Sequence, residues 1–442
     1  MKANKYSEQL RGWQFIANQL HTTSCGVFCL VFIWVLIAGL FIQLVALPVL
    51  PNLHAGHGLM MGGDWVRFHT DAVKLVTLMH DHGWVTWELR PQGNAPIGIA
   101  AATYYFFGIS EPWVLLPINA LLFAGGSVFL HGIFKSISNS RLALIAILPF
   151  VLFPSAGMIY GQIHKDVFSI TGALAVIYVW VQFSSYQKLN WQRLIAYVAI
   201  VALGGILIWI VRPYLLQPLI ASSFLITLLL VMLVGKGRGT LWWVGVFFCF
   251  IVLISLSNLS TTSTTSTTFI ESEASAGATY IDRMVFRINA ARVGFAKGYP
   301  DAGSNIDTNV RFSSLSDVVA YLPRALEIGL LAPFSSEWIA SGVSVGSGFM
   351  RFVAGMEMMV SYALLIGMGV LLYIAKDKRP AVLLTILFAI VMIIFLSLVV
   401  CNIGTLYRMR FGNYQLLNGL GVLGWGLLWQ KRTFLMRREN ER

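Results

Sequence analysis

Residues 25–48 read CGVFCLVFIWVLIAGLFIQLVALP, a run of 24 residues that contains no charged side chain. A helix needs about 20 mostly apolar residues to cross the hydrocarbon core of a bilayer. The run is too long for the core of a cleavable signal peptide, and no small-residue cleavage site follows it. It therefore predicts a first transmembrane helix that the protein retains.

The composition of the whole chain agrees with a membrane protein. Hydrophobic residues make up 57% of it and charged residues 11%, whereas a soluble domain carries about 25% charged residues. The net charge of +12 sits in short clusters between apolar runs, as in cytoplasmic loops, so no nucleic-acid partner is expected. The cysteines lack metal-type spacing and are interpreted as small hydrophobic residues: Cys25, Cys29, Cys249 and Cys401.

Further apolar runs of spanning length recur along the chain and predict an all-α, polytopic transmembrane helical bundle of about ten spans. An even number of spans places both termini in the cytoplasm, in agreement with a basic N-terminus and a basic tail. The chain 1–442 is interpreted as a single transmembrane domain. The expected spans are 25–48, 112–134, 141–157, 167–184, 193–211, 216–235, 240–258, 354–375, 380–400 and 413–430.

One apolar segment, 96–108, is too short to cross and is expected to lie on the membrane surface. Counting it as a span would move every later basic cluster to the outside, against the charge rule. Two long outer regions follow from this topology, 49–111 and 259–353. The second opens with a Ser/Thr-rich stretch, 260–268, and contains helical patterns at 280–297 and 315–331.

The first outer region contains GGDWVRFH at residues 62–69, before a helical pattern at 71–84. Asp64 is a candidate general base or metal-binding carboxylate, because the glycines before it let a substrate approach the backbone. Its other interpretation is a cap on the following helix. Arg67 and His69, in the same segment, are candidate substrate or phosphate contacts.

A short outer connection, YGQIHKD at residues 160–166, places three ionisable side chains at a membrane boundary. Such residues usually face a cavity or a pathway. His164 and Lys165 are candidate phosphate contacts, and Asp166 is a candidate catalytic residue that binds an acceptor or a cation. The alternative is a Lys165–Asp166 pair that only marks the boundary.

Three arginines lie on the outer side, where the charge rule does not favour them: Arg212, Arg408 and Arg410. Arginine binds phosphate in a bidentate manner, so these residues and the neighbouring Tyr407 are candidate contacts of a lipid phosphate. Snorkelling to lipid headgroups is the other explanation. The sequence has no Walker, GxGxxG, HExxH or zinc-type motif, so no cofactor is expected, and a divalent cation is left open.

The order of these features resembles the GT-C glycosyltransferases that use lipid-phosphate sugars, such as the aminoarabinose and protein mannosyltransferases. That resemblance implies two first-loop helices along the membrane, at 64–84 and 94–108. It also implies a first-loop catalytic acid at Asp64 and a second-loop acid at Asp166. The family often has a pair of acids where this chain has Gly63-Asp64, which leaves metal dependence open.

The sequence thus favours a glycosyltransferase of a bacterial cytoplasmic membrane. It would move a sugar from a polyprenyl-phosphate carrier to an envelope glycan or lipid acceptor on the periplasmic face, among membrane lipids. One alternative is an envelope polysaccharide polymerase or ligase that uses lipid-pyrophosphate glycans. The other is a transporter or scaffold without chemistry, which the scarcity of mid-span charges disfavours.

Overall fold

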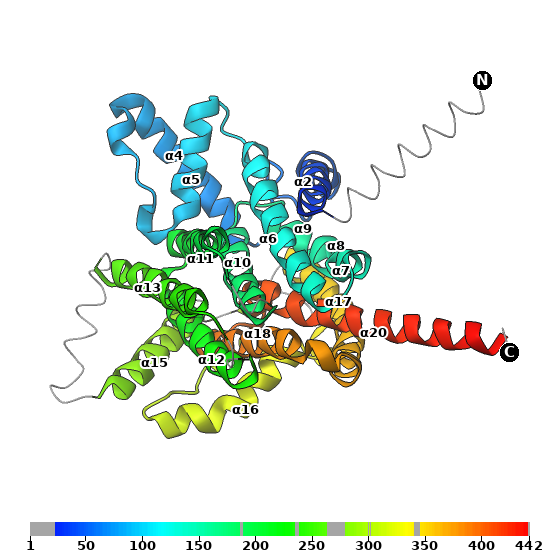
Figure 1. Ribbon diagram of the computed structural model, residues 1–442. Helices are drawn as coiled ribbons and strands as arrows, with labels where there is room; N and C mark the ends of the chain where they lie inside the picture. The colour runs from blue at the N-terminus through cyan, green and yellow to red at the C-terminus, as the bar shows by residue number, and fades with distance from the viewer. Residues whose placement is uncertain are drawn as a thin grey trace.

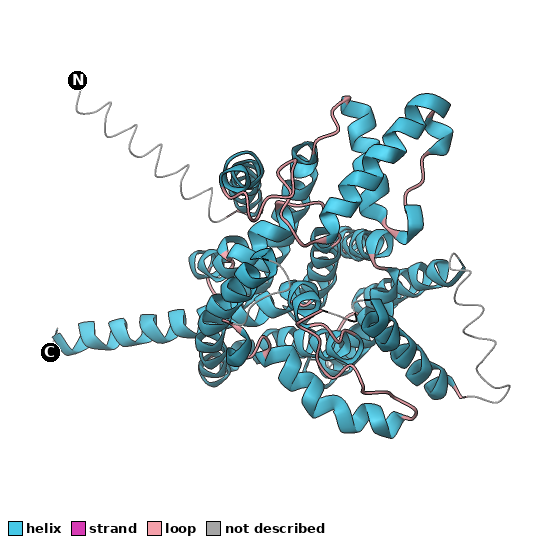
Figure 2. Cartoon of the chain, turned by 180° about the vertical axis from the view of Figure 1, so that it is seen from behind, coloured by secondary structure: helices cyan, strands magenta, loops and turns pink. Residues whose placement is uncertain are grey.

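The computed structural model describes residues 23–185, 189–234, 238–262, 279–298, 300, 302–339 and 345–440. Within these ranges the regular elements are helices, and the only strand-like pairings are two isolated bridges. Figures 1 and 2 show the helices gathered into one bundle, with the end of the last helix extending beyond it. The predicted all-α, polytopic fold is confirmed.

Eight helical segments of the described chain are long and apolar enough to cross a membrane. The first is α2 (Ser24–Phe41), which continues through a π-helical turn (Ile42–Ala46) and α3 (Leu47–Val49). The others are α6 (Leu116–Ile137), α10 (Asp166–Ser185), α11 (Trp191–Val211), α12 (Leu216–Val234), α13 (Thr240–Thr262), α17 (Val345–Ile374) and α18 (Arg379–Val399).

The expected span 141–157 is broken. It consists of α7 (Ser140–Ala146), α8 (Leu148–Leu152) and α9 (Pro154–Tyr160), with a bend of 70° before α9. Phe153 adopts a non-helical conformation (ψ 135°), because a residue before proline is pushed out of the helical region. Counted as one span, this bent pair raises the number to nine.

The tenth expected span lies within α20 (Phe411–Asn440), which is helical but not among the apolar candidates. Its first half carries the buried polar side chains of Asn413, Gln415 and Asn418. Asn418 donates to Ser361 of α17 at 3.1 Å. The ten predicted spans thus included one helix whose first half is buried against neighbouring helices and carries buried amide side chains.

Glycine lets α17 and α20 approach each other closely. A Cβ atom added to Gly424 would lie 1.8 Å from the carbonyl oxygen of Gly367, and one added to Gly421 would lie 2.0 Å from that of Leu364. No side chain fits at these positions. The two helices therefore pack backbone against backbone over this part of their length.

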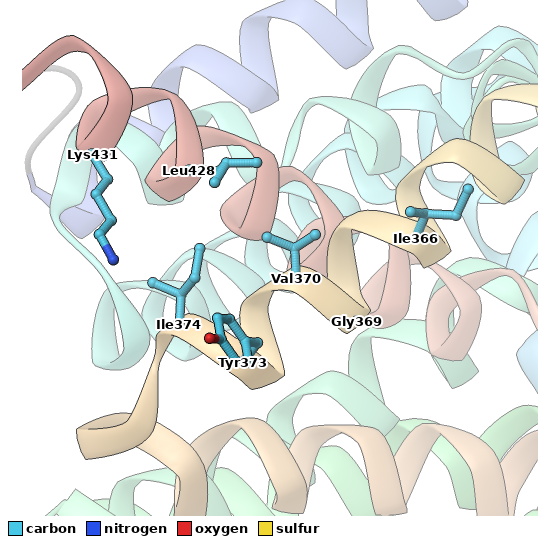
Figure 3. Close-up of a pocket in the computed structure, with 7 residues that line it drawn as sticks. All are labelled: Ile366, Gly369, Val370, Tyr373, Ile374, Leu428 and Lys431. Atoms are coloured by element: carbon cyan, nitrogen blue, oxygen red, sulfur yellow. The ribbon is translucent and has the colours of Figure 1, made fainter. Parts of the chain in front are cut away.

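Further along the same pair of helices lies a groove of about 550 Å³. Figure 3 shows its lining side chains between α17 and α20, with the Lys431 side chain at one end. The residues that line it are Ile366, Gly369, Val370, Tyr373, Ile374, Leu428 and Lys431. A helix rises 1.5 Å per residue, so the groove at Leu428 lies roughly 25 Å along α20 from Phe411, the first residue of that helix. The groove is therefore far from Arg408 and Arg410, which precede α20.

The first long region contains α4 (Asp64–His82) and α5 (Ala95–Phe107), which lie side by side at the edge of the molecule (Figure 1). They share a small core of their own, which includes Trp65, Phe68 and Tyr104. Buried residues at positions 65, 68, 72, 76 and 79 follow helical spacing. The helix begins earlier than the pattern at 71–84 predicted and agrees with the range 64–84 that the resemblance implied.

The second long region contains α15 (Tyr280–Gly298) and α16 (Leu315–Leu331), in agreement with the two predicted helices. A capping box starts α16: Ser314 accepts from the backbone of Asp317, whose carboxylate accepts from the backbone of Ser314. Residues 263–268 of the Ser/Thr-rich stretch lie outside the described residues.

Candidate functional site

The candidate site is built around Asp166, the first residue of α10. A carboxylate is favoured at a helix N-terminus by the unpaired backbone N–H groups there. Asp166 is fully buried. Its Oδ2 lies 2.6 Å from His164 Nδ1, and its Oδ1 lies 2.6 Å from Nη1 of Arg212, which follows α11. Both oxygens are therefore engaged by protein groups.

His164 bridges Asp166 and Arg408. Its Nδ1 lies 2.6 Å from Oδ2 of Asp166 and 3.3 Å from the backbone nitrogen of the same residue. Nε2 lies 3.2 Å from Nη1 of Arg408, and because arginine only donates, Nε2 must accept. Burial lowers the pKa of His164, although Asp166 opposes this effect. Burial and the nearby guanidinium of Arg408 thus both disfavour a positive charge on this imidazole.

Arg408 links the buried part of the site to the surface. Its Nη2 lies 3.8 Å from Oδ2 of Asp64, whose side chain is 46% exposed. Its guanidinium also lies 6.0 Å from the ring of Trp65. Asp64 is the first residue of α4, and the cap position belongs to Gly63, for which no side-chain cap bond exists. Asp64 thus forms the accessible end of a chain of polar contacts.

Lys165 lies beside this chain of contacts. Its Nζ donates to Oδ1 of Asn94, the residue before α5, at 2.6 Å, and it lies 5.5 Å from the ring of Phe68. Burial, followed by the charge of Arg212, lowers the pKa of Lys165, and the charge of Asp64 opposes this effect. Lys165 therefore ties the first long region to the site while it contributes a positive charge there.

Arg67 and His69 occupy different environments. Arg67 is on the exposed side of α4, where it donates to Gln92 at 2.7 Å and pairs with Asp71 at 3.4 Å. His69 is buried and bonded to the hydroxyl of Tyr104 at 3.1 Å. Burial lowers the pKa of His69. His69 belongs to the core shared by α4 and α5, and it does not contact Asp64 or Asp166 in any described interaction.

Tyr407 and Arg410 bind to segments other than the network around Asp166. The hydroxyl of Tyr407 donates to Oε2 of Glu357 on α17. Arg410 is buried, and its guanidinium donates to backbone carbonyls at the end of α16, those of Ile328, Gly329 and Ala332. The last carbonyls of a helix lack most of their intrahelical partners, so Arg410 caps the end of α16 and has few donors left for a phosphate.

The charges of the site do not cancel on its accessible side. Asp166 balances Arg212. Asp64 is then the one accessible carboxylate among the predicted site residues, beside the cations Arg408 and Lys165. Among the described residues, no group of three His, Cys, Asp or Glu side chains could hold a metal ion. The arrangement suits an anion, with one carboxylate available to accept a proton.

Three buried amides that support the connection before α10 were not predicted. Gln43 donates to the carbonyl of Gly161 at 2.7 Å. Asn119 donates to the carbonyls of Tyr160 and Gln162 at 2.8 and 3.0 Å, and Gln162 accepts from the backbone of Met60 at 3.0 Å. Gln43 and Asn119 interrupt apolar runs, and a polar residue in a span is itself a signal of function or support.

Together, the fold and the site define a polytopic helical membrane protein with a polar network at the end of its bundle. No protein-family model and no curated protein sequence matches the chain. Among solved structures, it is similar to the archaeal oligosaccharyltransferase AglB from Archaeoglobus fulgidus, solved with an inhibitory peptide and a dolichol-phosphate. The TM-score is 0.52 at 12% sequence identity, over 94% of this chain and 52% of that one. The chain therefore has a fold similar to that of this protein and spans about half of its length.

Proposed function

We propose that the protein is a membrane glycosyltransferase that transfers a sugar from a polyprenyl-phosphate carrier to a hydroxyl group of an envelope glycan or lipid on the periplasmic face. The observation that supports this most is the network Arg212–Asp166–His164–Arg408–Asp64. It joins four segments that are far apart in the sequence, and it ends at an accessible carboxylate beside two cations.

In this mechanism Asp64 takes the proton of the acceptor hydroxyl while that oxygen bonds to the anomeric carbon of the sugar. The bond between that carbon and the carrier phosphate breaks, and its electron pair stays on the phosphate oxygen. Arg408 and Lys165 stabilise the charge that develops there. Asp166 is too deeply buried to touch the substrate, so it orients His164 and holds Arg212.

The GT-C-like fold supports this proposal, because the AglB structure contains a dolichol-phosphate. That protein is named an oligosaccharyltransferase. Its name is also compatible with the second candidate function, a polymerase or ligase that uses lipid-pyrophosphate glycans. Two cations beside one carboxylate leave a single net positive charge, which suits one phosphate group better than two. The donor is therefore taken to be a monophosphate.

The test compares Asp64→Asn with Asp81→Asn, a matched change at an exposed position on the same helix. Purified variants are mixed with polyprenyl-phosphate hexoses or with polyprenyl-pyrophosphate oligosaccharides in a membrane extract, and release of the free carrier is measured. We expect release from the monophosphate donors by the wild type and Asp81→Asn, and a loss of about 10²–10⁴-fold in Asp64→Asn. Full activity of Asp64→Asn would remove Asp64 from the mechanism, and release from the pyrophosphate donors alone would favour the second function.

A further inference from the structure

Glu357 is a buried carboxylate outside the network just described. It lies on α17, is 4% exposed, and accepts three hydrogen bonds from two other segments. The backbone N–H and the hydroxyl of Ser155 donate to it at 2.7 and 2.6 Å, and the hydroxyl of Tyr407 donates at 2.5 Å. A carboxylate is costly to bury unless it is satisfied by such donors.

The contact with Ser155 stabilises the break in the bent span. Because Phe153 is non-helical and α9 starts at Pro154, the N–H of Ser155 has no carbonyl partner within its own helix. Glu357 supplies that acceptor. The chain then runs from α9 directly into the connection that carries His164, so the direction of α9 sets where that connection begins.

The contact with Tyr407 fixes α19 (Ile403–Met409), the short helix that carries Arg408. The start of this helix is held elsewhere: the backbone N–H of Ile403 donates to the carbonyl of Ser304 at 2.9 Å, and Asn402 caps the helix through the N–H of Thr405 at 2.9 Å. Tyr407 and its bond to Glu357 therefore restrain the end of α19, next to Arg408.

We propose that Glu357 is a positioning residue that holds α9 and α19 in register with each other and so sets the contact between His164 and Arg408. One carboxylate reaches both segments, and each of those segments leads within a few residues to one partner of that contact. Glu357 itself touches no other residue of the candidate site in any described interaction. Its effect on transfer rests on the proposed function, but its effect on geometry does not.

The test uses Tyr407→Phe, which removes one hydroxyl and keeps the ring, with Tyr414→Phe as the matched control. Tyr414 also donates from a hydroxyl to a helix-end carbonyl, that of Leu330 at 2.7 Å, and does not contact Glu357. Spin labels on cysteines introduced at Met158 of α9 and Thr405 of α19, in a background without the native cysteines, report the distance between the two helices.

We expect Tyr407→Phe and Glu357→Gln to broaden or shift this distance distribution, while Tyr414→Phe leaves it unchanged, even if thermal unfolding is affected to a similar extent in all three. Transfer should fall about 10²-fold in kcat in the first two variants. A distance distribution that stays the same in Tyr407→Phe and Glu357→Gln would overturn the proposal. The distance measurement needs no substrate, so it remains decisive even if the wild type shows no transfer.

Discussion

Asp64 and Asp166 occupy the same local position, the first residue of a long helix, but opposite environments. Asp64 is 46% exposed and lies 3.8 Å from one cation. Asp166 is fully buried and lies 2.6 Å from both His164 and Arg212. The helix N-terminus explains why a carboxylate is stable at either position. The tertiary surroundings decide that one remains available to a substrate while the other orients its neighbours.

The largest expected effect is the loss of the buried carboxylate. Asp166→Asn would leave Arg212 buried without a partner charge, which costs about 3–5 kcal/mol. We expect the detergent-solubilised variant to unfold at a clearly lower temperature than the wild type. Asp64→Asn should change the free energy of unfolding by about 1 kcal/mol or less, because a half-exposed ion pair contributes little to stability. Equal loss of stability in the two variants would contradict the contrast between them.

A second contrast concerns Arg408 and Arg410. Arg408→Ala should lower transfer about 10²–10³-fold, the usual effect of removing one donor to a developing anion, with little change in thermal unfolding. Arg410→Ala should lower stability by about 2–3 kcal/mol, because charged hydrogen bonds to the end of α16 are lost. Measuring kcat and the unfolding temperature of both variants separates these outcomes, and a catalytic defect without destabilisation in Arg410→Ala would return that residue to the site.

The sequence predicted the fold well because spanning helices are recognised by length and apolarity alone. It also predicted five residues that the structure brings together: Asp64, His164, Asp166, Arg212 and Arg408. Their common feature is a charged or ionisable side chain in a connection between apolar runs. The predicted topology places these connections on one side of the membrane, but it does not say which of the residues touch.

The roles of neighbouring residues were harder to predict. Arg408 and Arg410 were expected to act together, but Arg408 lies on α19, whereas Arg410 follows the end of that helix and contacts the end of α16. No helix was predicted at 403–409, so this separation could not be predicted. The role of Glu357 could not be predicted either, because it depends on a bent span and on α19 meeting α17, which are contacts between distant parts of the chain.

The smallest expected effect is a change in pH dependence at Lys165. Burial and the charge of Arg212 lower its pKa, so Lys165 loses its proton at a lower pH than an ordinary lysine, whose pKa is about 10.4. If the charged form holds the phosphate, kcat/KM should fall as pH rises through this lowered pKa. In Lys165→Arg the side chain stays charged, so the fall should move to higher pH while activity at neutral pH changes little. Lys74→Arg, an exposed control on α4, should keep the wild-type pH profile. If kcat/KM of Lys165→Arg fell at the same pH as that of the wild type, the titrating group would be another residue, and Arg408 would be the main cation at the leaving phosphate.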